Sequence, residues 1–256
     1  MRKPRRLSTE ELAPHIWELP ALRWPRTGPS DPAEQATTDS VPSVTTAAPA
    51  WIDWAALFGN SQPVEVEVGM GKGLFLLTQA LARPDVNFFG IEIVRKHQLY
   101  AATRCAIRGL SNVRTSCGDA TRLVRDFIAP GSVSAIHVLF PDPWWKKRHR
   151  KRRVFTPEFA ASIARAITLG GHLHIASDVG EYFEVMSGIV RAMPAFRELS
   201  AETSRESIDV AGYQTNFERK ARLKGTPVWR ARYQRTAEAV TVAPDPAAND
   251  LTTAPS

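Results

Sequence analysis

Segments with strand character and segments with helix character alternate from about residue 64 to residue 235, and this alternation limits the possible folds most strongly. Apolar runs predict strands at 64–68, 87–93, 113–117, 133–140, 172–177, 197–203 and 228–235. Helical patterns cover 51–58, 74–81, 95–108 and 182–192, and a further helix is expected to start at Thr156 and to end at Gly170-Gly171. The run 133–140 is apolar on both faces, which is typical of a central parallel strand. The sequence therefore predicts an α/β fold with a mostly parallel seven-stranded sheet and helices on both faces.

The composition changes at both ends of this region. Residues 1–50 are rich in Pro, Thr, Ser and Ala without apolar periodicity, so we expect a flexible basic arm, then one domain over 51–240 and a flexible tail over 241–256. No apolar stretch follows the basic start, and the longest uncharged apolar run is too short to span a bilayer. The two cysteines, Cys105 and Cys117, form no CxxC pair. We expect a cytoplasmic protein without a membrane segment or a metal site.

A glycine-rich turn follows the first predicted strand and reads Glu-Val-Gly-Met-Gly-Lys-Gly from Glu67 to Gly73. The third glycine comes one residue too early for a dinucleotide fingerprint, and Gly-Lys is followed by Gly where a phosphate-binding P-loop needs Ser or Thr. An acidic residue before such a turn suits a cationic ligand without phosphates, and S-adenosylmethionine is one. Glu65 shares a face with Glu67, and we prefer Glu67 because it lies nearer the turn.

Two further acids follow the next predicted strands. Glu92 ends the second strand, where a carboxylate reaches ribose hydroxyls in doubly wound folds. Asp119 comes just after the third strand and could accept the adenine amino group. Each acid alone is more easily explained as a helix N-cap or a solvated loop residue. Together they follow successive strands at one edge of the sheet, where ligands bind in such folds.

Positive charge is concentrated in one place. The chain has 33 Lys and Arg against 26 Asp and Glu, and seven of the basic residues lie in 146–153; without them both kinds number 26. The run follows Phe-Pro-Asp-Pro-Trp-Trp, in which two prolines stiffen the backbone around Asp142. Most such runs are localisation signals or solvated loops. This one lies in mid-domain beside a carboxylate and favours contact with nucleic acid. The expected contacts are Lys147, Arg148, Arg150, Lys151, Arg152 and Arg153.

Taken together, these motifs resemble those of the tRNA (guanine-N7-)-methyltransferases, which have the Rossmann-like class I methyltransferase fold. The resemblance extends over about residues 64–235. The matching segments are 67–73, Gly-Ile-Glu-Ile at 90–93, Gly-Asp-Ala at 118–120, Phe-Pro-Asp-Pro-Trp at 140–144 with the basic run, Ser-Asp at 177–178, and Thr-Asn-Phe-Glu at 215–218. The Phe-Pro-Asp-Pro-Trp segment with its basic run is the most specific of these.

The resemblance implies a methyl transfer from S-adenosyl-L-methionine to N7 of a guanine in the variable loop of tRNA, with Asp142 as the catalytic residue. It implies a cofactor pocket formed by Glu67, Gly69, Gly71, Gly73, Glu92, Asp119 and Asp142. The implied substrate contacts are Lys146, Asp178, Thr215, Asn216, Phe217 and Glu218. Two alternatives stay open: a class I methyltransferase with another RNA or protein target, and an RNA-binding module without activity. The sequence also leaves open whether the protein is a monomer or a homodimer.

Overall fold

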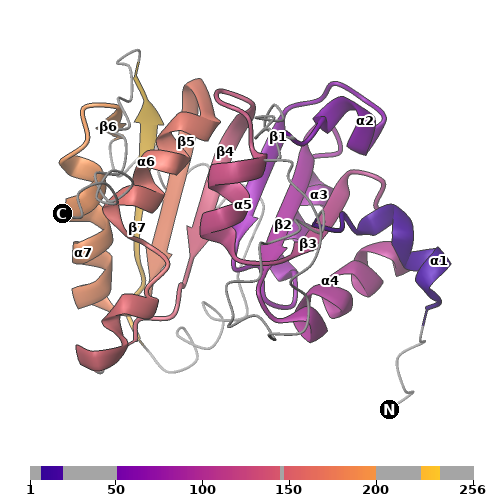
Figure 1. Cartoon of the computed structure of the whole chain (residues 1–256), viewed down its shortest axis with the longest axis horizontal. Helices are drawn as coiled ribbons and strands as arrows, with labels where there is room; N and C mark the ends of the chain where they lie inside the picture. Colours follow the sequence, from indigo (N-terminus) through magenta and orange to yellow (C-terminus); the bar gives the residue numbers. More distant parts are fainter. Residues whose placement is uncertain (1–6, 20–50, 145–146, 200–225, 237–256) are drawn as a thin grey trace, which may run out of the picture.

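The structure is a computed structural model, and it describes residues 7–19, 51–144, 147–199 and 226–236. Within these residues seven strands form one twisted sheet in the middle of the molecule, with helices on both faces (Figure 1). The strands are β1 (Val64–Val68), β2 (Asn87–Glu92), β3 (Val113–Cys117), β4 (Val133–Leu139), β5 (Ile167–Ser177), β6 (Phe196–Glu198) and β7 (Trp229–Arg235). The described part of the chain thus confirms the predicted α/β class and the seven-stranded sheet.

The order of the strands across the sheet is β3-β2-β1-β4-β5-β7-β6. Strands β1 to β5 pair in parallel, and β7 is antiparallel to both β5 and β6. The carboxyl ends of the five parallel strands therefore meet at one edge of the sheet. The chain moves outward from β1 to β3 and then returns to place β4 on the other side of β1. Ligands of doubly wound folds bind at such a reversal.

Two layers of helices cover the sheet. The helices are α1 (Thr9–Leu12), α2 (Trp54–Phe58), α3 (Leu74–Ala82), α4 (Arg95–Ile107), α5 (Ala120–Phe127), α6 (Pro157–Ala166) and α7 (Gly180–Arg191), with 3-10 turns η1 (Ala13–His15) and η2 (Lys147–Arg152). One apolar cluster joins the sheet to α5, α6 and α7, and a second joins it to α3 and α4. Burial from both sides explains why β1 and β2 are buried along their whole length. No helix in the described ranges is long and apolar enough to cross a membrane.

The expectation of a flexible arm over residues 1–50 is wrong for residues 7–19. These residues form α1 and η1 and then run beside the edge strand β3, where Ile16 forms a parallel bridge with Thr115. The Trp17 ring packs edge-on against Phe89 of β2 at 6.0 Å between centroids. Two short turns followed by one bridging residue produce no periodic pattern, which is why the sequence did not predict them. The rest of the predicted arm, residues 1–6 and 20–50, and the predicted tail over 241–256 lie outside the described residues.

The start of β5 also differs from the prediction. Helix α6 begins as expected, with the Thr156 hydroxyl capping its first turn, but it ends at Ala166 and not at Gly170-Gly171. Strand β5 starts directly at Ile167, which pairs with Val133, and the pairing with β4 shifts register after that residue. A Cβ at Gly171 would lie 2.6 Å from the Ser134 carbonyl oxygen. The two glycines therefore accommodate an irregularity in the sheet and do not end a helix.

Candidate active site

The predicted site residues within the described part of the chain lie at the carboxyl edge of the parallel strands. The loop after β1 carries the glycine-rich turn, Glu92 ends β2, and Asp119 follows β3. Asp142 and Asp178 follow β4 and β5. Because these strands are parallel and adjacent, their five ends line one side of the molecule. The predicted contacts Lys146, Thr215, Asn216, Phe217 and Glu218 lie outside the described residues.

The glycine-rich turn needs glycine for two physical reasons. Gly69, Gly71 and Gly73 have φ angles of +73°, +55° and +66°, in the left-handed region that favours glycine. A Cβ at Gly73 would also lie only 2.6 Å from the Cβ of Ala101 in α4. The turn is fixed to β2, since the backbone N–H groups of Gly69 and Met70 both donate to the Ile91 carbonyl. A rigid turn of this shape leaves room for a ligand to approach the backbone.

Two buried carboxylates, Glu67 and Glu92, lie beside this turn. Glu92 accepts hydrogen bonds from the backbone N–H groups of Gly71 (2.8 Å) and Val94 (2.9 Å). Glu67 is 4% exposed, and its Oε2 atom has no hydrogen-bond partner among the described residues. Burial raises the pKa of Glu67 to about 8, and the negative charge of Glu92 acts in the same direction. No Lys or Arg pairs with Glu67 in the part of the chain that the structure describes, and a positively charged ligand would supply such a partner.

Glu65, the other acid on β1, is fully occupied by protein groups. Arg83 donates to both of its oxygens at 2.7 and 2.9 Å, and Nε2 of His137 lies 2.9 Å from Oε2. Burial alone would raise the pKa of Glu65, but the hydrogen bonds and charges of His137 and Arg83 hold it well below its ordinary value. A satisfied ion pair of this kind leaves no oxygen for a ligand. This arrangement supports the preference for Glu67 over Glu65.

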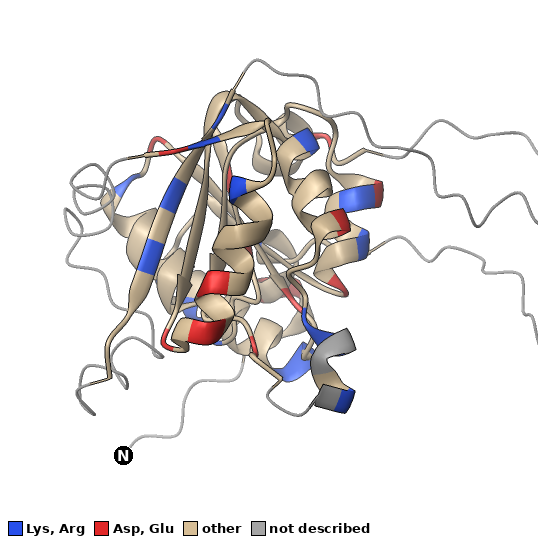
Figure 2. Ribbon diagram, turned by 90° about the vertical axis from the view of Figure 1, so that its left-hand side faces the viewer, with Lys and Arg blue, Asp and Glu red and all other residues tan. Residues whose placement is uncertain are grey.

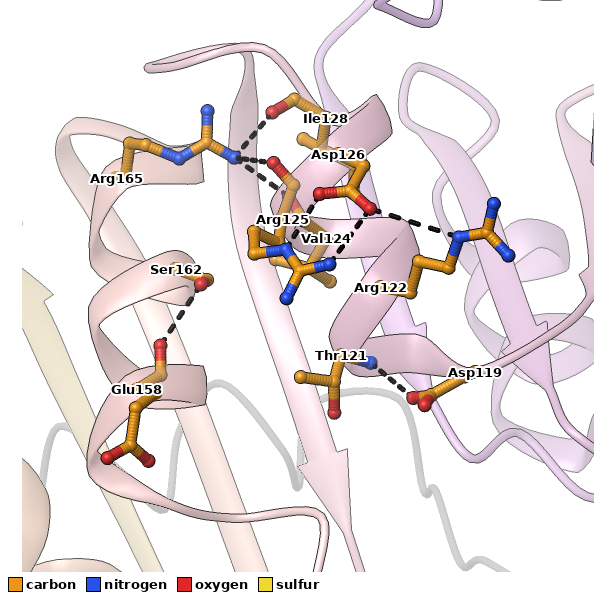
Figure 3. A network of polar contacts seen from close by, with 10 residues as sticks. All are labelled: Asp119, Thr121, Arg122, Val124, Arg125, Asp126, Ile128, Glu158, Ser162 and Arg165. Carbon is orange, nitrogen blue, oxygen red and sulfur yellow. Dashed lines mark hydrogen bonds and ion pairs between the residues drawn. The ribbon is translucent and has the colours of Figure 1, made fainter. Parts of the chain in front are cut away.

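Asp119 has a structural role that the sequence also allowed. It is the N-cap of α5, and its Oδ1 accepts the backbone N–H of Thr121 at 2.8 Å (Figure 3). This contact uses one oxygen and fixes the carboxylate at the end of β3. The backbone N–H of the preceding Gly118 donates to the Glu92 carbonyl, so the loops after β2 and β3 are held together. The side chain of Leu19, from the N-terminal segment, lies against Gly118 and was not predicted as part of this region.

The Pro-Asp-Pro turn after β4 is strained at both ends. Phe140 and Trp144 have φ angles of +54° and +43°, which bulky side chains rarely adopt. The Phe140 side chain is buried, and the backbone N–H of Phe140 donates to the Ala176 carbonyl, so the start of the turn is anchored to β5. The Asp142 side chain between these two residues is exposed. The fold thus holds one carboxylate out from the edge of the sheet on a stiff backbone.

Arginines of the basic run brace this turn, which the sequence did not predict. Nε of Arg153 donates to the Pro143 carbonyl at 2.8 Å, and its guanidinium lies 4.6 Å from the centre of the buried Tyr182 ring of α7. The Arg152 guanidinium lies 5.1 Å from the Trp144 ring centre. Arg152 and Arg153 were expected to contact RNA, and in the structure both are already engaged with the turn. Strain in the turn is therefore balanced by contacts from the segment that follows it.

Most of the basic run, including Arg152, forms the 3-10 turn η2, which follows the Pro-Asp-Pro turn along the chain. Arg148 is exposed and lies beside His149, whose ring packs edge-on against Trp144 at 5.8 Å. The side chains of the predicted contacts Lys147, Arg150 and Lys151 lie outside the described part of the structure. The position of η2 puts the most basic segment of the chain next to Asp142.

The resemblance implies that Asp178 binds substrate, and its position two residues before α7 would also allow it to cap that helix. Helix α7 starts at Gly180 with Val179 as its N-cap, and no side chain caps it. The Ser177 hydroxyl instead accepts the N–H of Val179. The half-buried Asp178 carboxylate makes no hydrogen bond to another described residue. Asp178 therefore does not cap α7, and its carboxylate lies at the edge of the sheet without a hydrogen-bond partner in the described part of the chain.

Comparisons with known proteins agree with this geometry. A family described as "Putative methyltransferase" matches residues 61–231. A curated tRNA (guanine-N(7)-)-methyltransferase from Rhodopirellula baltica is 43% identical, over 84% of this chain and 81% of that protein. A protein of the same name from Pseudoalteromonas atlantica is 35% identical, over 73% of this chain and 78% of that protein. Among solved structures, the 16S rRNA methyltransferase KamB matches with a TM-score of 0.51 at 18% identity, over 73% of this chain and 94% of that chain, which is a likeness of fold.

Proposed function

This chain belongs to the tRNA (guanine-N7-)-methyltransferase family, and we propose that it transfers a methyl group from S-adenosylmethionine to N7 of a guanine in the variable loop of tRNA. The observation that carries this proposal is the position of the Pro-Asp-Pro turn. Asp142 follows β4, and the glycine-rich turn follows the neighbouring strand β1. A methyl donor held by the turn and a base held by the Asp142 loop would therefore meet at one edge of the sheet.

The residues around the glycine-rich turn fit S-adenosylmethionine. This ligand carries an ammonium and a sulfonium but no phosphate, and it supplies an activated methyl group. The unpartnered oxygen of Glu67 suits a cationic group, and Gly69, Gly71 and Gly73 let the backbone come close to the ligand. Glu92 would accept ribose hydroxyls, and the Asp119 loop would border the adenine. These assignments belong to the proposal.

Asp142 would act on the guanine through its charge. N7 has a lone pair in the plane of the base, so it needs no deprotonation before it attacks a methyl group, and the base becomes positive during the transfer. A carboxylate held near the base favours that charge. We expect Asp142→Asn to lower kcat at least about tenfold while tRNA affinity stays within a factor of about three. A near-normal kcat in this variant would exclude the electrostatic role.

The tRNA would be held by charge and by specific contacts. The η2 segment would bind phosphates without reading sequence, as clustered Lys and Arg do. Asp178, with no other partner among the described residues, would accept N–H groups of the guanine. Lys146 and the segment 215–218 complete the proposed substrate contacts.

The direct test is an analysis of modified nucleosides. The purified chain is incubated with unmodified tRNA transcripts and isotopically labelled S-adenosylmethionine, and the digested nucleosides are examined by mass spectrometry. We expect labelled 7-methylguanosine with the native protein and none above background with Asp142→Ala. Label in a different nucleoside of the tRNA would assign another target base, and label found only in parallel incubations with ribosomal RNA or with protein would assign another substrate. Absence of both label and cofactor binding would leave an RNA-binding module.

A further inference from the structure

We propose that the outer side of α4, together with Lys72, is a second surface that binds the phosphate backbone of the tRNA. It consists of Lys72, Lys96, Tyr100, Arg104 and Arg108, which we call the α4 patch. The inference rests on the proposed function, because it deepens the description of how the RNA substrate is held. It concerns a surface apart from the basic run at 146–153, which supplied the whole charge excess of the sequence.

The spacing of the residues gathers them on one side of the helix. Lys96, Tyr100, Arg104 and Arg108 follow each other at intervals of four, which places them in one row. Lys96 and Arg108 are exposed, and the Tyr100 side chain is 47% exposed. The buried residues of α4, among them Ala101 and Cys105, face the sheet instead. The row is therefore a solvent-facing surface.

The tyrosine ring holds two cations in fixed positions. The Lys72 ammonium lies 5.7 Å from the ring centre of Tyr100, and the Arg104 guanidinium lies 5.9 Å from it. Arg104 also donates from Nη1 to the Lys72 carbonyl at 2.9 Å, which ties α4 to the glycine-rich turn. The cations are thus arranged before any ligand arrives, which lowers the entropic cost of binding.

The patch lacks the acidic partners that other surface arginines have. Residues 95–108 contain no Asp or Glu, and within the described ranges Lys72, Lys96, Arg104 and Arg108 take part in no ion pair. On α5, by contrast, Arg122 and Arg125 both lie beside Asp126 (Figure 3). A cluster of unneutralised cations is the signature of a polyanion contact.

The position of the patch fits the same RNA that reaches Asp142. Lys72 lies in the turn after β1 and Lys96 in the first turn of α4, after β2, at the edge of the sheet that also carries the Asp142 loop after β4; the row along α4 extends from there to Arg108, toward the opposite edge. Figure 2 shows the distribution of Lys and Arg over the ribbon, which includes sites outside the basic run. A tRNA is far larger than a guanine, so an RNA bound at this edge can contact both basic segments.

The test compares two double charge reversals with the same change in net charge. Lys96→Glu with Arg108→Glu alters the α4 patch without touching the glycine-rich turn. Arg122→Glu with Arg125→Glu alters α5, on the opposite face of the sheet. We expect the patch variant to bind tRNA at least about tenfold more weakly near physiological salt. The slope of log affinity against log salt concentration should also become less steep, by the amount that corresponds to the loss of about two phosphate contacts. The α5 variant should bind like the native protein.

Two controls separate this inference from the proposed function. Calorimetry with S-adenosylhomocysteine should give the native affinity for both variants, and the rate of methyl transfer at saturating tRNA should be native. Equal weakening in both variants would show a general charge effect and overturn the inference, as would native tRNA affinity in the patch variant. Loss of binding to vesicles of anionic phospholipid with unchanged tRNA binding would assign the patch to a membrane surface. If the native protein methylates no tRNA, the proposed function itself fails.

Discussion

At the scale of single residues, Glu67 shows how the fold prepares a ligand site. Its carboxyl group is buried beside Glu92 and has an unpartnered oxygen among the described residues, so its pKa rises to about 8 and the group holds a proton at neutral pH. A cation bound next to it would favour the ionised form and lower this pKa. The proton must then leave when the ligand binds. Affinity for a cationic ligand should therefore rise with pH and level off above about 8.

We expect calorimetric titrations with S-adenosylmethionine at pH 7 to release close to one proton, seen as a heat that depends on the ionisation enthalpy of the buffer. Glu67→Gln should abolish this dependence and weaken binding, because the neutral amide has no proton to lose and no charge to offer. The neighbouring acid Glu65 is not a suitable control position, because Glu65→Gln would break the ion pair between Glu65 and Arg83. Heats that are equal in two buffers for the native protein would contradict the argument.

Arg153 acts on Asp142 through the backbone. Its Nε–H donates to the Pro143 carbonyl and its guanidinium lies over Tyr182, so it joins the strained turn to α7. Lysine would keep the charge, but it has no planar guanidinium that could donate to the Pro143 carbonyl and stack on the Tyr182 ring at the same time. We expect Arg153→Lys to lower kcat about tenfold or more, because small displacements of a catalytic group are costly. Affinity for tRNA and its salt dependence should stay native, since the charge is kept.

The matched control for Arg153 is Arg148→Lys, which makes the same exchange at an exposed position of the same segment. Its kcat should be native. Thermal unfolding of both variants checks that the fold is intact. If Arg153→Lys has the native kcat while the salt slope of tRNA binding changes, the residue contacts phosphate and does not position the turn.

At the scale of elements, the side chain of Arg165 on α6 forms hydrogen bonds to the end of α5. Nη2 of Arg165 on α6 lies within 3.0 Å of the carbonyl oxygens of Val124, Arg125 and Ile128 at the end of α5 (Figure 3). The last carbonyls of a helix have no partner within it, and a cation there is favourable. We expect Arg165→Ala to lower the free energy of unfolding by about 2 kcal/mol. Denaturation with urea measures this change.

Arg122→Ala is the comparison for Arg165, since the Arg122 side chain on α5 makes a long contact of 3.9 Å to Asp126 and no other polar contact within the described residues. An ion pair of this kind on the surface contributes between about 0 and 1 kcal/mol. Similar losses of unfolding free energy in the two variants would show that the three carbonyl contacts of Arg165 stabilise the fold no more than a surface ion pair does.

The elements that the sequence predicted are those with a strong local pattern. Strands β1 to β4 have the expected positions within one or two residues, since their apolar runs are bounded by turn residues. Helix α5 was not predicted, although Asp119 caps its start and it buries Leu123, Val124 and Phe127, because an element of eight residues is too short to show a clear helical period. The early end of α6 depends on the pairing of Ile167 with Val133, a contact 34 positions apart that no local pattern contains.

The grouping of the candidate site residues in space follows from the fold class. Glu67 and Glu92 lie at the carboxyl ends of β1 and β2, and Asp119 and Asp142 follow β3 and β4, so the parallel arrangement of these strands places the four acids at one edge. The sequence could not show that Glu65 would be neutralised by Arg83 and His137, or that Arg153 would bind its own loop. These outcomes depend on side chains from elements that are distant along the chain. A local motif predicts which residue types are present but not which partner each one finds.

At the scale of the whole molecule, the sheet has two edges that must not pair with other chains. Among the strands that the structure describes, the outermost on one side, β6, has three residues. The outermost strand on the other side, β3, has five, and residues 15–17 cover it: the Trp17 N–H donates to the Thr115 carbonyl, and the Thr115 hydroxyl donates to the His15 carbonyl. Glu18 then pairs with Arg95 at 2.7 Å. The N-terminal segment is thus part of the domain.

Deletion of residues 1–19 should therefore harm the molecule in three ways that deletion of residues 1–6 should not. Removal of the Trp17 ring from its contacts with Phe89 and Phe127 should lower the free energy of unfolding by about 3 kcal/mol. The exposed edge of β3 should promote self-association, which light scattering after size-exclusion chromatography would detect. Leu19 lies against Gly118, beside the proposed adenine region, so S-adenosylhomocysteine should also bind more weakly. If both deletions leave the unfolding midpoint and the ligand affinity unchanged, the segment is an accessory to the fold, and the domain begins near residue 51.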